Sequence, residues 1–109
     1  MLTATLKGEA LKLTDWQAKY HPGFLEDLKR LSKKDLEAFQ KKRKKIIDNP
    51  LRQKHLRKAD NCYREPVTKN IRIVYHVHEK SIWFLTIKKH DSAYDEFRKR
   101  LSNIKEKYV

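Results

Sequence analysis

The sequence predicts an α+β domain in which two helices precede a small antiparallel sheet and a last helix follows it. Apolar residues recur at helical spacing between residues 22 and 48, and again from residue 92 onward. Between them, residues 62–87 alternate with the period of two that is typical of strands. A short strand before the first helix completes the expected order β-α-α-β-β-β-α. Consecutive strands with short links are expected to pair antiparallel.

The composition predicts one small basic domain. The chain has 109 residues, and its 27 Lys and Arg outnumber 14 Asp and Glu, which gives a formal net charge of +13. Such an excess favours a polyanionic partner such as RNA. A generally solubilising surface is the alternative explanation. We expect residues 1–15 to form an N-terminal extension and residues 16–109 a single domain.

Several classes of site do not fit the sequence. The single cysteine, Cys62, excludes an internal disulfide and a cysteine-based zinc site, and it suits a reducing cytoplasm. The only glycines, Gly8 and Gly23, exclude a phosphate-binding loop and a dinucleotide fingerprint, so no cofactor is expected. No segment reads as a secretory signal or a membrane span. His76 and His78 share a strand face, but no third metal ligand lies near them in sequence.

The N-terminal half predicts one strand and two helices. The aromatic run Trp16–His21 before Pro22-Gly23 suits a strand. After Pro22, a first helix carries the apolar positions Phe24, Leu25, Leu28 and Leu31. Ser32 opens a second helix through the weak capping pattern "SKKD", and "DNP" at 48–50 ends it. Its apolar face is Leu36, Phe39, Ile46 and Ile47, and its "KKRKK" run at 41–45 is expected to be mostly solvated.

The second half begins with a basic loop, residues 51–61, and continues with three strands. "CYREPV" is a strand weakened by Pro66, which cannot donate to a ladder. "IRIVYHV" places Ile71, Ile73, Tyr75 and Val77 on one face and Arg72, Val74 and His76 on the other. "SIWFLTI" is apolar on both faces, as expected of a central strand. The last helix carries Tyr94, Phe97, Leu101 and Ile104 at helical spacing.

These segments together resemble the RelE/ParE superfamily of toxins from type II toxin–antitoxin systems. The resemblance spans about residues 16–101 and rests on "HPGFLEDLKRL", "IIDNPL", "LRKADNCYREPV", "IRIVYHV", "IWFLTI" and the ending "HDSAY". It implies a small curved sheet with an N-terminal helical hairpin. The RelE branch of this superfamily cuts mRNA in the ribosomal A site without a metal. The partners implied are a cognate antitoxin, the ribosome and mRNA, with no membrane and no small-molecule cofactor.

The resemblance also implies a catalytic set of Arg72, His90, Tyr94 and Arg64. Arg72 matches the strand arginine of the family and would hold the scissile phosphate through its planar guanidinium. His90 would be the acid or the base, because histidine titrates near physiological pH. Tyr94, at i+4, would stack on a base or bond the phosphate. The expected RNA-binding residues are Lys54, His55, Arg57, Lys58, Lys88 and Lys89.

The chain departs from RelE, which uses several Lys and Arg residues, and its His-x-x-x-Tyr ending is nearer to YafQ and YoeB. Each catalytic residue has a structural alternative: Arg72 as a sheet-face ion pair, His90 as an exposed turn residue and Tyr94 as part of the core. Two other functions stay open. One is a ParE-like inhibitor of DNA gyrase without nuclease activity, and the other is a non-catalytic basic RNA-binding module.

Overall fold

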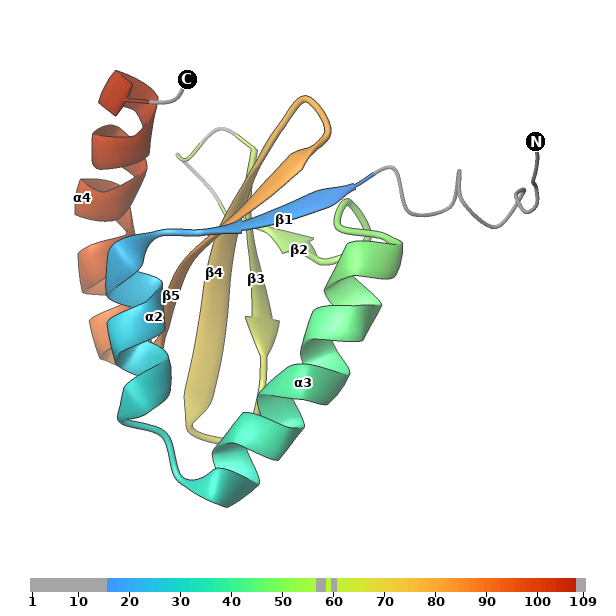
Figure 1. Cartoon of the computed structure of the whole chain (residues 1–109), viewed down its shortest axis with the longest axis vertical. Helices are drawn as coiled ribbons and strands as arrows, with labels where there is room; N and C mark the ends of the chain where they lie inside the picture. Colours follow the sequence, from blue (N-terminus) through green and yellow to red (C-terminus); the bar gives the residue numbers. More distant parts are fainter. Residues whose placement is uncertain (1–15, 57–58, 60, 108–109) are drawn as a thin grey trace.

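The computed structural model describes residues 16–56, 59 and 61–107, and the predicted N-terminal extension lies outside them (Figure 1). The described elements follow the predicted order, with one additional short strand. In chain order they are β1 (Gln17–Tyr20), α2 (Pro22–Lys29), α3 (Lys33–Asp48), β2 (Lys54–His55), β3 (Cys62–Pro66), β4 (Ile71–His78), β5 (Ser81–Lys89) and α4 (His90–Lys107). The mixed α+β architecture predicted from the sequence is therefore confirmed.

The five described strands form one sheet in the order β1-β5-β4-β3-β2. β2 through β5 pair antiparallel, as expected of strands with short links. Two features were not predicted. β1 joins the far edge parallel to β5, because α2 and α3 intervene before the chain returns to the sheet. The basic loop contains β2, a two-residue strand beside Tyr63 and Arg64.

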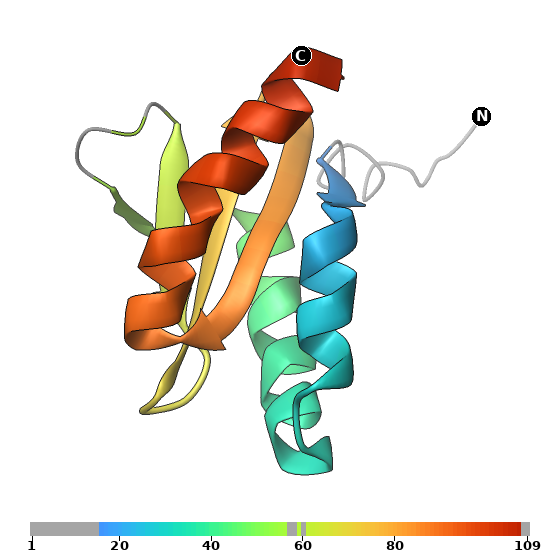
Figure 2. The ribbon, with the colours of Figure 1, turned by 90° about the vertical axis from the view of Figure 1, so that its left-hand side faces the viewer.

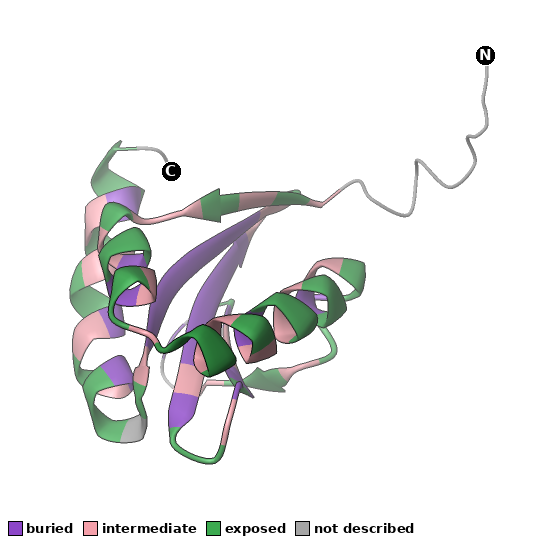
Figure 3. Cartoon of the chain, turned by 60° about the horizontal axis from the view of Figure 1, so that its bottom comes forward, coloured by how far each residue is buried: buried purple, intermediate pink, exposed green. Residues whose placement is uncertain are grey.

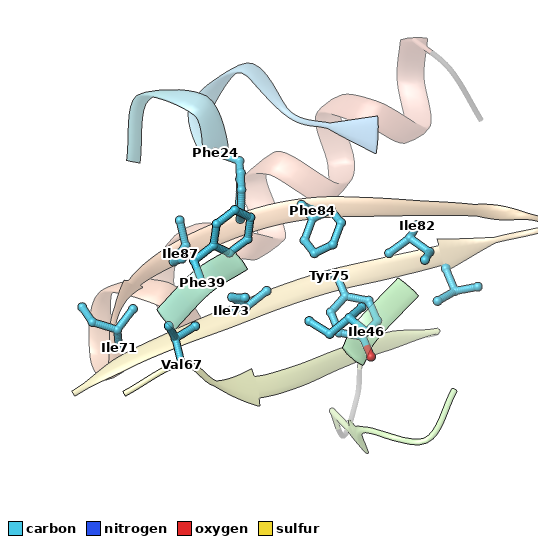
Figure 4. Close-up of a cluster of buried hydrophobic side chains, with 11 residues drawn as sticks. Phe24, Phe39, Ile46, Val67, Ile71, Ile73, Tyr75, Ile82, Phe84 and Ile87 are labelled. Atoms are coloured by element: carbon cyan, nitrogen blue, oxygen red, sulfur yellow. The ribbon is translucent and has the colours of Figure 1, made fainter. Parts of the chain in front are cut away.

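The sheet lies between helices on both faces, with α2 and α3 on one side and α4 on the other (Figure 2). Strands β4 and β5 at its centre are almost wholly buried, whereas the outer faces of the helices are exposed (Figure 3). The predicted apolar face of β4 packs under α2 and α3 in a cluster that includes Phe24, Phe39 and Phe84 (Figure 4). A second cluster under α4 contains Val74, Trp83, Leu85, Phe97 and Ile104.

A β-bulge in β5 changes which residues of this strand face each cluster. Tyr75 pairs with Phe84 and Val74 pairs with Thr86, so Leu85 is the additional residue. Beyond the bulge, the alternation of side chains between the two faces of the sheet is shifted by one residue. Ile82, Phe84 and Ile87 therefore enter the cluster under α2 and α3, while Trp83 and Leu85 enter the cluster under α4. The prediction that this strand is covered on both faces is confirmed.

The helix boundaries follow local signals. Ser32 accepts a hydrogen bond from the Asp35 backbone N–H at 3.1 Å and so caps α3 as predicted. The expected strand residue His21 is instead the N-cap of α2, with Pro22 at the first helical position. Its Nδ1 accepts a hydrogen bond from the Gly23 N–H at 2.8 Å, and its Nε2 lies 3.1 Å from Oδ1 of Asn103 in α4. The first bond requires Nδ1 without a proton.

The outer edge of β5 is covered by two charged side chains where β1 ends. β1 pairs with β5 only as far as Phe84. Beyond it, Arg100 of α4 donates to the Leu85 carbonyl at 2.8 Å, and Asp27 of α2 accepts from the Ile87 N–H at 3.3 Å. Arg100 Nη1 also donates to Asp27 Oδ2 at 2.7 Å. Such covering satisfies backbone groups that an open strand edge would expose.

The Asp27–Arg100 pair is buried and closely packed. The Asp27 side chain is 2% exposed and that of Arg100 is 11% exposed. Lys88 Nζ, 3.1 Å from Asp27 Oδ1, adds a second cation. A Cβ at Gly23 would lie 2.6 Å from Arg100 Cζ, so a larger residue at this position would displace the guanidinium from its present place beside Asp27. The pair thus joins helices on opposite faces of the sheet.

Asp27→Ala is expected to destabilise the protein by about 3–5 kcal/mol, because it leaves Arg100 buried without its carboxylate. The double variant Asp27→Leu/Arg100→Met should lose much less, since both charges are removed together. Lys29→Ala, which breaks an exposed pair with Glu26, is the control and should change the free energy of unfolding by less than about 0.5 kcal/mol. Urea denaturation measures all three. A cost for Asp27→Ala no larger than for the control contradicts the role of the pair.

The His21 cap predicts a loss of stability in mild acid. Burial lowers the pKa of His21 below its usual 6.5, and Arg100 and Lys107 lower it further, against the opposing effects of Asn103 and Asp27. The unfolded chain therefore takes up a proton at a higher pH than the folded one. The stability that His21 contributes is complete above pH 6.5, and it declines as the pH falls toward the pKa of His21 in the folded chain. His21→Asn keeps a capping acceptor that does not titrate. Its unfolding free energy, measured between pH 7.5 and 5, should fall less than that of the wild type.

Candidate functional site

Arg72 lies at the end of the sheet where β3 turns into β4. It pairs in register with Pro66 of β3 and Lys88 of β5. Its Nη1 donates to the backbone carbonyls of Thr68, Lys69 and Ile71, at 2.9, 3.1 and 3.2 Å. Among the described residues it forms no ion pair with a carboxylate, so the alternative of a sheet-face ion pair is not what the structure shows. The turn holds Nη1, and a guanidinium has further donors on Nε and Nη2.

Arg64 and Tyr94, two residues of the predicted catalytic set, meet on the face covered by α4. Arg64 Nη1 donates to the Tyr94 hydroxyl at 3.2 Å, and the guanidinium carbon lies 6.0 Å from the ring centroid. Both side chains are half-buried. Tyr94 also packs against the apolar cluster under α4. Its core role and its contact with the predicted site are therefore compatible.

His90 is the first residue of α4 and directly follows the last residue of β5. Tyr94 lies one helical turn later, as expected from the spacing. The side chain of His90 lies outside the part of the structure that is described. Its predicted role in acid–base chemistry therefore stays a prediction.

Two neighbouring cavities contain Arg72 in their walls. One, of about 550 Å³, is lined by Arg52, Gln53, Lys54, Arg64, Glu65, Pro66 and Arg72. The other, of about 500 Å³, is lined by Lys69, Asn70, Arg72, Lys89, Asp91 and Ser92. The predicted RNA-binding residues Lys54 and Lys89 are thus adjacent to Arg72, one on each side. Arg52 and Lys69 were not among the predicted site residues. The sequence offered a signal for each, because Arg52 lies close to Lys54 and Lys69 lies in the turn between β3 and β4.

Of the other predicted RNA-binding residues, the structure describes His55 and Lys88, and neither lines a cavity with Arg72. His55 is exposed on β2 with its ring edge-on to Tyr63, at 5.1 Å between centroids. Lys88 is 22% exposed and pairs with Asp27, so it belongs to the buried charge cluster rather than to the open surface. Arg57 and Lys58 lie outside the described residues. Lys54 and Lys89 are therefore the described members of this set that line a cavity together with Arg72.

The "KKRKK" run is mostly solvated, as predicted, since Lys41, Lys44 and Lys45 are exposed, but three of its cations also contact the sheet. Lys42 and Lys45 lie 3.5 and 3.3 Å from Oε2 of Glu65, which is 6% exposed on β3. Arg43 donates to the Tyr20 hydroxyl at 2.5 Å. Three of the five cations therefore fix α3 to the sheet, because the helix lies over a buried carboxylate and a tyrosine. Lys41 and Lys44 are exposed and form no ion pair among the described residues.

Cys62 is buried with its Sγ 3.6 Å from Nδ1 of His76, and the rings of His76 and His78 stack at 6.5 Å. Across residues 16–56, 59 and 61–107, no three His, Cys, Asp or Glu side chains gather as a metal site would require. Within the same residues, no helix combines the length and the apolar character needed to cross a bilayer.

The sequence profile of the ParE toxin of type II toxin–antitoxin systems, parDE, matches residues 18–94. Solved structures share the fold. A mutant of the E. coli toxin RelE in the free state is 21% identical with a TM-score of 0.69, over 79% of this chain and 97% of that chain.

Two further solved structures share the fold. RelE–RelB from Pyrococcus horikoshii is 21% identical with a TM-score of 0.59, over 69% of this chain and 94% of that chain. The YoeB dimer from Staphylococcus aureus is 21% identical with a TM-score of 0.59, over 70% of this chain and 98% of that chain. No curated protein sequence matches the chain.

The cations around Arg72 predict salt-dependent binding of single-stranded RNA. Removing one cation that binds a phosphate should reduce the slope of log K against log salt by about 0.7. Arg52→Ala/Lys54→Ala should therefore flatten the slope measured by fluorescence anisotropy. Lys41→Ala/Lys44→Ala removes the same charge from the exposed face of α3 and is the matched control. Equal slopes for the two double variants would show that net charge alone attracts the RNA.

Proposed function

Since the chain belongs to the ParE toxin family of type II toxin–antitoxin systems, within the RelE/ParE superfamily, we propose that it cuts ribosome-bound mRNA and so stops translation. The observation that carries this proposal is the position of Arg72. It lies between two cation-lined cavities, one shared with Arg64 and the other reaching the start of α4. A phosphodiester at Arg72 would lie among donors suited to a phosphorane.

The proposed reaction is a metal-independent transesterification. The 2′-oxygen attacks the adjacent phosphorus, the P–O5′ bond breaks, and the products are a 2′,3′-cyclic phosphate and a free 5′-hydroxyl. One group takes the proton of the 2′-hydroxyl and another protonates O5′. His90 performs one of these transfers in this proposal. Arg72 stabilises the additional negative charge of the phosphorane through Nε and Nη2, which its bonds to the turn do not use.

Arg64 and Tyr94 act together in the proposed site. Their hydrogen bond fixes the tyrosine ring at the first turn of α4. The ring can then stack on a base, while the remaining donors of Arg64 face the cavity that contains Arg72. This assignment follows the contact between two residues 30 positions apart in the chain.

The proposed partners are the ribosome with its mRNA and a cognate antitoxin, which would place the action in the cytoplasm. The fold of this chain also occurs in one chain of each of three toxin–antitoxin complexes, namely RelE–RelB, RelBE and YoeB–YefM. We expect the antitoxin segment to be acidic or amphipathic and to cover the cations around Arg72.

Inhibition of DNA gyrase is the second candidate, because the matching family is that of the ParE toxins. Such an inhibitor needs no acid–base group. A supercoiling assay with purified gyrase separates the two functions. Inhibition of supercoiling without mRNA cleavage would favour this second candidate.

Arg72→Ala should lower the rate of mRNA cleavage in a purified translation reaction about 10²–10³-fold, as expected when a donor to the transition state is removed. His90→Ala should lower it about 10²–10⁴-fold, because it removes a group that transfers a proton. Lys99→Ala, an exposed cation on α4, is the control and should cleave at the wild-type rate. Thermal unfolding verifies that each variant is folded. Wild-type cleavage by folded Arg72→Ala and His90→Ala proteins would falsify the assigned site.

A further inference from the structure

A third cavity lies on the other side of the sheet end, between α2 and the first turn of α4. Its volume is about 260 Å³, and it is lined by Asp27, Arg30, Leu31, Ile71, Ile87, Lys88, Lys89 and Ser92. Ile71 and Ile87 lie together at one end of the apolar cluster (Figure 4). With Leu31 they give the cavity apolar walls, and charged groups surround them. The volume is below the roughly 300–1,000 Å³ typical of sites for drug-sized ligands, so the cavity suits a small flat group.

The polar groups of this cavity favour an anionic ligand. The carboxylate of Asp27 is already neutralised by Arg100 at 2.7 Å and Lys88 at 3.1 Å. Arg30 and Lys89 are exposed, and neither has a carboxylate partner among the described residues. The cavity therefore combines apolar walls with two cations that no nearby acid neutralises. A nucleotide has the complementary chemistry, since a flat base is joined to a phosphate.

The cavity adjoins the proposed site. Lys89 and Ser92 line both this cavity and the one that contains Arg72. In register, Ile71 pairs with Lys89 and Arg72 pairs with Lys88. Successive strand residues face opposite sides of a sheet. Ile71 therefore lines this cavity, while Arg72 lines the neighbouring one. An RNA strand held at Arg72 has only to pass Lys89 to place its next nucleotide here.

We propose that this cavity binds one base of the RNA, from a nucleotide next to the phosphate held by Arg72. Leu31 and Ile71 contact the base, above the buried Ile87. Lys89 and Arg30 bind its flanking phosphate, and the Ser92 hydroxyl reaches the edge of the base. This inference rests on the proposed function, because Arg72 defines which nucleotide is adjacent. It adds the C-terminal end of α2, through the cap residue Arg30 and the following Leu31, to the surface that contacts RNA.

The test is a set of RNA oligonucleotides that carry a 2′-O-methyl group at the cleavage position and therefore cannot be cut. One abasic nucleotide is placed in turn at each neighbouring position. Affinity for the full-length protein is measured at low salt by fluorescence anisotropy. Omission of the bound base should weaken wild-type binding about tenfold at one position only.

Two variants of the cavity locate that base. Leu31→Ser should bind the intact RNA less tightly and should show no further weakening with the abasic RNA. Arg30→Ala should weaken binding of both RNAs by the same factor, because it removes a cation that binds phosphate. Leu25→Ser and Lys29→Ala are matched controls on α2, which directly precedes the two tested residues, since Leu25 is 46% exposed and both control residues lie outside the cavity. Both should respond to the abasic nucleotide as the wild type does.

Equal affinities for intact and abasic RNAs at every position, or no binding at low salt, would overturn the base site. An abasic effect that persists in Leu31→Ser would do the same. Weaker binding of the purified cognate antitoxin by Leu31→Ser, with RNA binding unchanged, would assign the cavity to the protein partner instead. Cleavage is measured separately on ribosomes. Cleavage without the abasic effect overturns only the base site, and the abasic effect without cleavage overturns only the proposed reaction.

Discussion

The buried pair of Asp27 and Arg100 is the interaction on which the position of the other elements depends. It joins α2 to α4 around the edge of β5, although the two helices lie on opposite faces of the sheet. The same two side chains bond the backbone at Leu85 and Ile87, just before β5 ends and α4 begins. The start of α4, where His90 and Ser92 lie, is therefore held from both faces. The two charges stabilise the fold only as a pair, because either side chain left buried without the other would lower the stability of the protein.

Two groups among the described cations have different roles. Lys42, Lys45, Lys88 and Arg100 pair with the buried carboxylates of Glu65 and Asp27. These cations fix helices to the sheet. A second group lines the cavities at the end of the sheet, namely Arg30, Arg52, Lys54, Arg64, Lys69, Arg72 and Lys89. The concentration of the second group in one region is what points to a phosphate-bearing partner, more strongly than the net charge does.

Local patterns predicted most of the secondary structure correctly. The Ser32 cap, the end of α3 at Asp48 and the alternation of β4 each depend on residues a few positions apart. The parallel pairing of β1 could not be read in the same way, because strand direction depends on how the intervening helices pack. The bulge at Leu85 was hidden as well, since a strand that is apolar on both faces shows no break in its alternation.

For the candidate site, the residue pattern alone was enough to place Arg72 on a strand and His90 and Tyr94 one helical turn apart. These properties follow from backbone periodicity, which is local. The contact of Arg64 with Tyr94 and the ion pair of Lys88 with Asp27 depend instead on the folded arrangement of the elements. Side chains 30 to 73 positions apart come together only when the strand register and the helix packing have been set. The same applies to the cavity between α2 and α4, because its walls come from four elements that no local pattern connects.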